Sequence, residues 1–139
     1  MISQSGETAD TLNALKLAKE HGPTLALVNV EASTIARLAD ASIPLRAGPE
    51  RGVASTKAFC AQLMSMAALS VVAGRQRGVL DEDNEERLTA AFERLPAVLA
   101  RTLELEGSLV PIAKSIGERP SAMYLGRGAF HALSLEGAL

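Results

Sequence analysis

The run TLALVNV at residues 24–30 is the feature that most restricts the fold. It is short, continuous and apolar, and its Val and Leu content is typical of a strand buried on both faces of a parallel sheet. A helical pattern that includes Leu12 and Leu15 precedes this run and ends at Gly22-Pro23. A helix that leads into a buried strand predicts an α/β fold with right-handed crossovers.

The next segment continues the alternation of helix and strand. Ser33 or Thr34 can cap a short helix, and SIPLR at 42–46 indicates a second, weaker strand. Apolar residues make up 47% of the chain but aromatic residues only 3%, which favours helices packed on a sheet over an all-β sandwich. The predicted fold class is α/β, a three-layer αβα sandwich with a parallel sheet.

The second half of the chain is predicted to be mostly helical. Pro96 lies inside a long helical pattern and is expected to kink that helix or split it in two. The predicted segments are helices at 56–74, 81–106 and 109–116, a strand at 121–128 and the start of a helix in 132–139.

Charge and cysteine content exclude several classes of function. The net charge is −2 with a pI near 5.7, so there is no basic excess to attract nucleic acid or an anionic membrane. Cys60 is the only cysteine, which rules out an internal disulfide and a cysteine-based metal site. The longest apolar stretch, 58–73, is interrupted by polar residues and is expected to be too short and too polar for a membrane span. With no leader-like segment, we expect a soluble, cytoplasmic protein.

The opening loop, SQSGET at residues 3–8, directly precedes a helical pattern, with only two residues before it. Its hydroxyl groups and the free N–H groups of a helix N-terminus suit a phosphate monoester, and Gly6 would let the backbone approach the ligand. The loop lacks the lysine of a P-loop. On these residues alone, a plain turn with a helix cap explains the pattern as well.

Three stretches together carry a resemblance to a known family. ISQSGETADTL, GPERGVASTKAF, and YLGRG followed by LEGAL resemble the sugar isomerase (SIS) domains, most closely the isomerase half of the glutamine–fructose-6-phosphate aminotransferases. The resemblance covers essentially the whole chain, with the motifs in family order. It implies an SIS-type fold that is incomplete at both ends.

The resemblance also implies a set of substrate-binding residues. The first loop would bind the phosphate and the sugar through Ser3, Gln4, Ser5 and Thr8. Val53 would contact the sugar through its backbone and Ser55 through its hydroxyl. A glycine turn that feeds a helix is the structural alternative for this second stretch. Glu136 matches a family glutamate near the active centre, although an exposed glutamate early in a helix explains it equally well.

We assign no catalytic residue, metal ligand or cofactor to this chain. The resemblance places the family's ring-opening lysine, catalytic histidine and proton-transfer glutamate beyond Leu139. Lys57 is therefore expected to be structural or ion-pairing, and neither His21 nor His131 is taken as a general base. Cys60 sits in an apolar helical pattern, which is typical of packing.

The implied function belongs to a parent enzyme that makes glucosamine 6-phosphate from fructose 6-phosphate and glutamine, without metal or organic cofactor. This chain would be its sugar-phosphate-binding part and inactive alone, with 1–117 as a partial first SIS domain and 118–139 as the start of a second. A glutaminase domain is expected in the parent chain, and a homodimer is expected because SIS domains pair. An SIS-type glucosamine-6-phosphate deaminase or ketose–aldose isomerase, and a non-catalytic sugar-phosphate sensor, remain alternatives.

Overall fold

The structure is a computed structural model that describes residues 1–51 and 55–139. It divides into two compact units, Met1–Leu88 and Thr89–Leu139, which are described separately here. Compact units follow packing within the chain and do not test the predicted domain border between residues 117 and 118, which stays a prediction.

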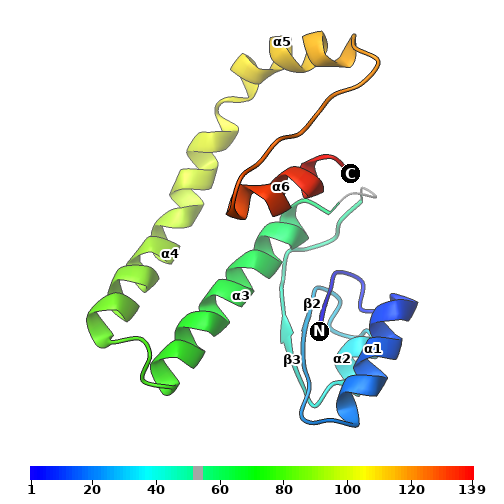
Figure 1. The fold of residues 1–139 in the computed structure, drawn as a ribbon, viewed down its shortest axis with the longest axis vertical. Coiled ribbons are helices and arrows are strands. Elements are labelled where there is room, and N and C mark those ends of the chain that lie inside the picture. The colour runs from blue at the N-terminus through cyan, green and yellow to red at the C-terminus, as the bar shows by residue number, and fades with distance from the viewer. Residues whose placement is uncertain (52–54) are drawn as a thin grey trace. The chain divides into compact units, whose positions relative to one another are not determined.

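A three-stranded parallel sheet forms the centre of the first unit (Figure 1). Its order is β1 (Ile2–Ser3), β2 (Leu25–Val28) and β3 (Ala41–Pro44), with both neighbouring pairs parallel. This arrangement confirms the two strands and the parallel sheet predicted from the apolar runs. Sequence reasoning missed β1, because two residues are too few to produce a periodic pattern.

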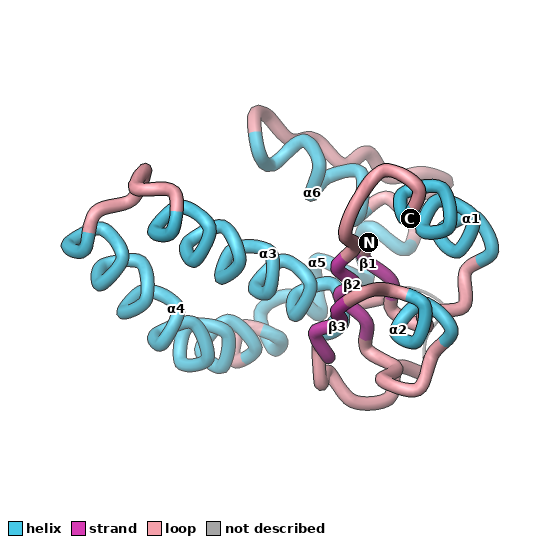
Figure 2. The backbone as a smooth tube through the Cα atoms, turned by 90° about the horizontal axis from the view of Figure 1, so that it is seen from below, coloured by secondary structure: helices cyan, strands magenta, loops and turns pink. Residues whose placement is uncertain are grey.

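Two helices, α1 (Ala9–Lys19) and α2 (Thr34–Leu38), lie on the same side of this sheet (Figures 1 and 2). The core between them consists of the buried side chains of Leu15, Ala26, Val28 and Ile35. Ser33 is the N-cap of α2, and its hydroxyl accepts a hydrogen bond from the Ala36 N–H, as one of the two predicted caps requires.

A long helix, α3 (Lys57–Gln76), comes after β3 in the chain, and α4 (Glu82–Leu103) begins six residues after α3 ends. Both helices confirm the sequence prediction. Of the two outcomes expected at Pro96, the split does not occur, because α4 continues through that residue as a single element, and the kink stays a prediction. Arg75 lies near the end of α3 and pairs with Glu85 at 2.9 Å, which ties the two helices at their turn.

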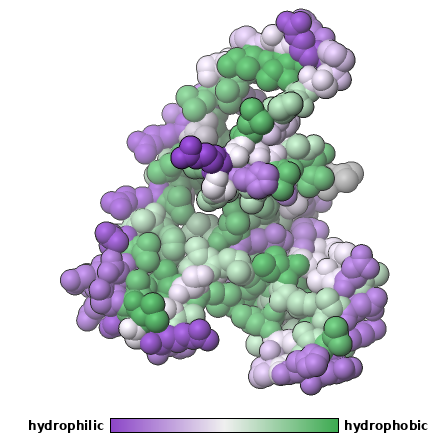
Figure 3. All heavy atoms as spheres, viewed as in Figure 1, coloured by the Kyte–Doolittle hydropathy of each residue, from purple (hydrophilic) through white to green (hydrophobic). Residues whose placement is uncertain are grey.

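The length of α3 corrects the expectation about a membrane span. The helix runs for 20 residues and contains an 18-residue window of mean hydropathy 1.4, so length and composition alone permit a span. Its polarity is partly masked, since the Ser70 hydroxyl donates to the Met66 carbonyl at 2.8 Å. Exposed apolar side chains on α3 include Leu63 and Val72, and Figure 3 shows apolar surface open to solvent. This is weak evidence, because core helices of soluble proteins meet the same test. The absence of a membrane partner stays a prediction.

The second unit contains α5 (Glu106–Gly117) and α6 (Ala129–Gly137), both close to the predicted helical segments. The predicted strand at 121–128 is wrong, because these residues form an irregular connection before α6. A strand needs a neighbour for its backbone N–H and C=O groups, and the described residues of this unit contain no other strand.

Asp40 clamps the edge of the sheet where β2 and β3 begin. Its carboxylate accepts hydrogen bonds at 2.8 Å from the Lys19 ammonium, the Thr24 hydroxyl and the Thr24 N–H. The Lys19 hydrogen bond, followed by the Thr24 bonds, holds the pKa of Asp40 well below its ordinary value. The end of α1 and the starts of two strands are thus joined through one side chain.

At the opposite edge, Gly6 presses its backbone against Ser33. Gly6 has a φ of +67°, and a Cβ built on it would lie 2.1 Å from the Ser33 Oγ and 2.4 Å from the Ser33 Cβ. Ser33 is only 1% exposed, so it has no room to move away. The Ile35 N–H also donates to the Gly6 carbonyl at 3.0 Å. Gly6 is therefore required for packing the first loop on α2.

We predict that Asp40→Asn lowers stability at neutral pH. The folded-state pKa of Asp40 lies below its unfolded value, so its contribution is present above about pH 4 and is lost as the pH falls through the folded-state pKa. Thermal unfolding should show a lower Tm for the variant than for the unaltered chain at pH 7, and this difference in Tm should be smaller below pH ~4. Glu31→Gln is the control, since Glu31 only reaches exposed Arg46 at 3.7 Å. A difference in Tm that does not change with pH would contradict the ionic role of Asp40.

We predict that Gly6→Ala destabilises the first unit by about 3 kcal/mol, from a strained φ and a clash with Ser33. Gly78→Ala is the matched control, because Gly78 has the same φ of +67° with nothing within 4 Å of the added Cβ. It should cost only about 1 kcal/mol. Urea unfolding of the two variants separates the clash from the backbone strain, and equal losses would show that the contact with Ser33 is unimportant.

Candidate functional site

The candidate site lies at the edge of the sheet where the three parallel strands end. The loops that follow the strands are residues 4–8 and 29–33 and, in the third loop, the described residues 45–51 and 55–56; parallel pairing makes all three start at the same edge. In open α/β sheets, ligands bind in the crevice outside the carboxyl ends of the strands. Two of the three loops carry residues that the sequence predicts as ligands.

Hydroxyl groups organise the first loop from within. The Ser3 Oγ accepts a hydrogen bond from the Gly6 N–H at 2.9 Å, and the Ser5 Oγ accepts one from the Glu7 N–H at 3.2 Å. Ser3 is buried with 7% exposure, whereas Ser5 and Gln4 are half-buried. Each serine oxygen acts as an acceptor here, and within residues 1–51 and 55–139 neither hydroxyl donates to a protein group, so each hydrogen can be donated to an anion.

The loop leads directly into the N-terminus of α1. Thr8 is the N-cap residue, is exposed, and makes no side-chain cap hydrogen bond. The alternative interpretation is that the loop only caps this helix through a hydroxyl group. The Thr8 hydroxyl does not form such a cap. An uncapped helix N-terminus carries free N–H groups and a partial positive charge, which attract an anion.

Glu7 turns away from α1 and caps the neighbouring helix. Its carboxylate accepts a hydrogen bond from the Thr34 N–H at 2.7 Å, at the start of α2. This bond, with smaller contributions from the Thr34 side chain and the Arg37 charge, lowers the pKa of Glu7. The negative charge in the loop is thereby directed at a helix N-terminus.

Asn29 joins all three loops and was missed by sequence reasoning. Its N–H donates to the Gln4 carbonyl at 3.2 Å, and its side-chain amide donates to the Gly48 carbonyl at 2.8 Å. The Ala47 N–H donates to the Asn29 Oδ1 at 2.8 Å. The signal available in the sequence was the polar amide of Asn29 near the end of the apolar run at 24–30.

Glu50 caps α3 from the third loop. Its Oε1 accepts hydrogen bonds from the N–H groups of Thr56 and Lys57, at 2.7 and 3.1 Å, and its Oε2 accepts one from the Ser55 hydroxyl at 2.9 Å. The Thr56 N–H is the main cause of the lowered pKa of Glu50. No standard capping spacing reveals this residue, because it lies six positions before the N-cap Thr56.

The other predicted residues have different outcomes. Ser55 is half-buried at the start of α3, whereas Val53 lies outside the described residues. Glu136 is half-buried on α6 in the second unit, and its place in a pocket stays a prediction. The Lys57 ammonium donates to the Pro49 carbonyl at 2.7 Å, which agrees with a structural role. Among the described residues, no cluster of His, Cys, Asp or Glu is suited to a metal ion.

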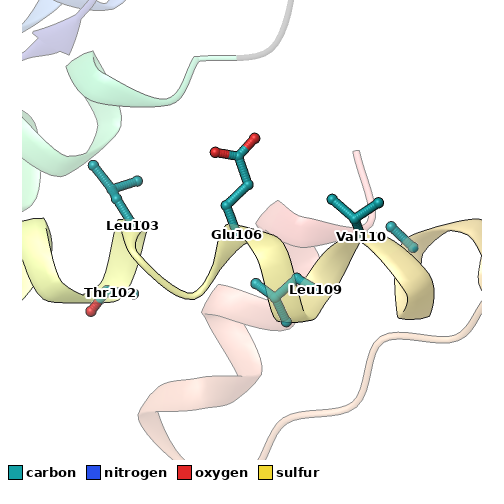
Figure 4. A pocket seen from close by; sticks show the side chains of 6 residues that line it. Thr102, Leu103, Glu106, Leu109 and Val110 are labelled. Carbon is teal, nitrogen blue, oxygen red and sulfur yellow. The ribbon is translucent and has the colours of Figure 1, made fainter.

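An open hollow of about 560 Å³ lies at the turn between α4 and α5. Figure 4 shows Leu103, Glu106 and Val110 pointing to the same side of this turn. The hollow is mostly apolar and contains none of the predicted ligand residues. Apolar walls without converging polar groups do not suit a sugar phosphate, so we place the candidate site at the loops.

Known proteins are similar to this chain over nearly its whole length. The glutamine–fructose-6-phosphate aminotransferase (isomerizing) of Bartonella quintana is 47% identical over 139 residues, 99% of this chain and 23% of that protein. The enzyme of the same name from Bradyrhizobium diazoefficiens is 48% identical, with the same coverage. The chain thus spans about a quarter of the length of these curated relatives.

A solved structure is similar over nearly the whole chain. The C-terminal domain of glucosamine-fructose-6-phosphate aminotransferase from Francisella tularensis has a TM-score of 0.94 and 33% identity, and the match covers 99% of this chain and 39% of that one. This match confirms the predicted αβα fold class. A family model described as the SIS domain matches residues 1–72 of the 139. This chain belongs to the SIS domain family.

Proposed function

We propose that the carboxyl edge of the sheet binds a sugar phosphate, with the phosphate held by the first loop. The observation that carries this proposal is made at the N-terminus of α1. The N-cap residue Thr8 makes no side-chain cap hydrogen bond there. Ser3 and Ser5 accept backbone N–H groups and keep their hydroxyl hydrogens for an anion. Helix N–H groups and serine donors together form the chemistry that phosphate oxygens require.

We propose fructose 6-phosphate and glucosamine 6-phosphate as the ligands, from the names of the relatives. These relatives are aminotransferases that also isomerise, and this chain spans 23% of the Bartonella quintana protein. Their complete reaction, with glutamine as the amino donor and a glutaminase domain, is therefore proposed for a longer protein that contains this segment. Homodimer formation and the cytoplasmic location stay predictions.

Within the site, we propose Ser3, Gln4, Ser5 and Thr8 as the phosphate and sugar ligands. Ser55 is proposed as a sugar contact from the third loop, and Val53 and Glu136 stay candidates from the resemblance alone. Asn29 supports the arrangement, because its hydrogen bonds to Gln4 and Gly48 join the first and third loops.

We predict that Thr8→Val and Ser5→Ala each weaken binding of fructose 6-phosphate by about ten-fold or more, since each removes a hydrogen bond to a charged group. Calorimetric titration of the folded chain measures the affinity. Ser70→Ala is the control, because it removes a hydroxyl that only bonds within α3. A folded chain that does not bind, or variants that bind as tightly as the unaltered chain, would contradict the proposed function.

A further inference from the structure

The hydrogen bond between Ser55 and Glu50 determines what Ser55 can offer to a ligand. The Ser55 Oγ lies 2.9 Å from the Glu50 Oε2, and an ionised carboxylate can only accept. Ser55 therefore commits its single hydroxyl hydrogen to Glu50. The lone pairs of its oxygen remain, so Ser55 can accept a hydrogen bond from a ligand but has none to donate.

Several contacts keep Glu50 in this arrangement. Its other oxygen accepts from the Thr56 N–H at 2.7 Å, the Thr56 hydroxyl at 3.2 Å and the Lys57 N–H at 3.1 Å. These donors stand at the start of a 20-residue helix, whose N-terminus favours a negative charge. The lowered pKa of Glu50 agrees with a carboxylate that stays ionised at neutral pH.

The arrangement discriminates between the two ends of a sugar phosphate. Phosphate oxygens are hydrogen-bond acceptors, so they find no donor at Ser55 and are repelled by the charge of Glu50. A sugar hydroxyl or an amino group is a donor and fits the Ser55 oxygen. The first loop presents the opposite chemistry, because Ser3 and Ser5 retain hydrogens to donate.

We propose that Glu50 is a positioning residue that holds Ser55 as a hydrogen-bond acceptor for a hydroxyl or amino group of the bound sugar phosphate. This inference rests on the proposed function and adds to it the residue that makes Ser55 an acceptor. The phosphate lies at the first loop, and a donor group of the sugar lies at Ser55. No residue in this arrangement is required to move a proton or form a bond.

The test compares two ligands on the unaltered chain and on Glu50→Gln. The glutamine amide can donate to the Ser55 oxygen where the carboxylate accepted its hydrogen, so one lone pair is taken and the hydroxyl is no longer held as an acceptor for the sugar. Binding of fructose 6-phosphate should weaken by about ten-fold, as expected for a lost hydrogen bond. Binding of inorganic phosphate, followed by NMR chemical shifts, should stay unchanged because it uses the first loop alone.

Asp81→Asn is the matched control. Asp81 also caps a helix through a carboxylate, accepting from the Asn84 N–H at 2.8 Å, but it holds no hydroxyl of the site. Its replacement perturbs a helix N-terminus in the same way and should leave both affinities within about two-fold. The Tm of each variant separates a loss of stability from a loss of binding.

Each result other than the expected one overturns the inference in a distinguishable way. If the unaltered chain binds fructose 6-phosphate and Glu50→Gln binds it equally well, Glu50 does not position Ser55 and the proposed function stands. If Glu50→Gln weakens sugar phosphate and inorganic phosphate alike, Glu50 is only structural. If the folded, unaltered chain binds neither ligand, the proposed function fails and the inference fails with it.

Discussion

The backbone of the first loop lies against the N-cap of α2, and the position of the loop at the carboxyl edge depends on this contact. Gly6 can approach Ser33 so closely only because it has no Cβ. The approach brings Glu7 within reach of the Thr34 N–H and leaves the N-terminus of α1 without a side-chain cap. The candidate anion site thus exists because a neighbouring helix takes the carboxylate of the loop.

A glutamate from a loop caps a neighbouring helix at two places on this edge of the sheet. Glu7 satisfies the N-terminus of α2, and Glu50 satisfies that of α3. Both carboxylates are directed at helix N–H groups, so their charge is partly compensated before any anion arrives. Of the helices that begin at this edge, α1 is the one whose N-cap has no side-chain partner and that receives no such carboxylate among the described residues. The uncapped N–H groups of α1 therefore make it a better candidate for a phosphate than α2 or α3, whose N–H groups donate to a carboxylate.

Sequence reasoning predicted the architecture well where a pattern was long enough to be periodic. The run at 24–30, the helix after residue 56 and the cap at Ser33 are all confirmed. It failed where the outcome depended on neighbours: residues 121–128 have strand composition but no strand to pair with. The candidate ligands came from the first loop and the family resemblance. The side-chain partners of Asn29 lie 18 and 19 residues away, and those of Glu50 lie five to seven residues away. Both residues were missed because no local motif encodes these spacings.

The contacts that build the candidate site all lie close together along the chain. Glu7 reaches 27 residues to Thr34, and the Asn29 side chain reaches 19 to Gly48. The cost of closing a loop rises only slowly with its length, so closing these loops costs little more than closing shorter ones. During synthesis the residues that make these contacts are all released before α4. The candidate edge therefore needs no residue of α4 for its own hydrogen bonds.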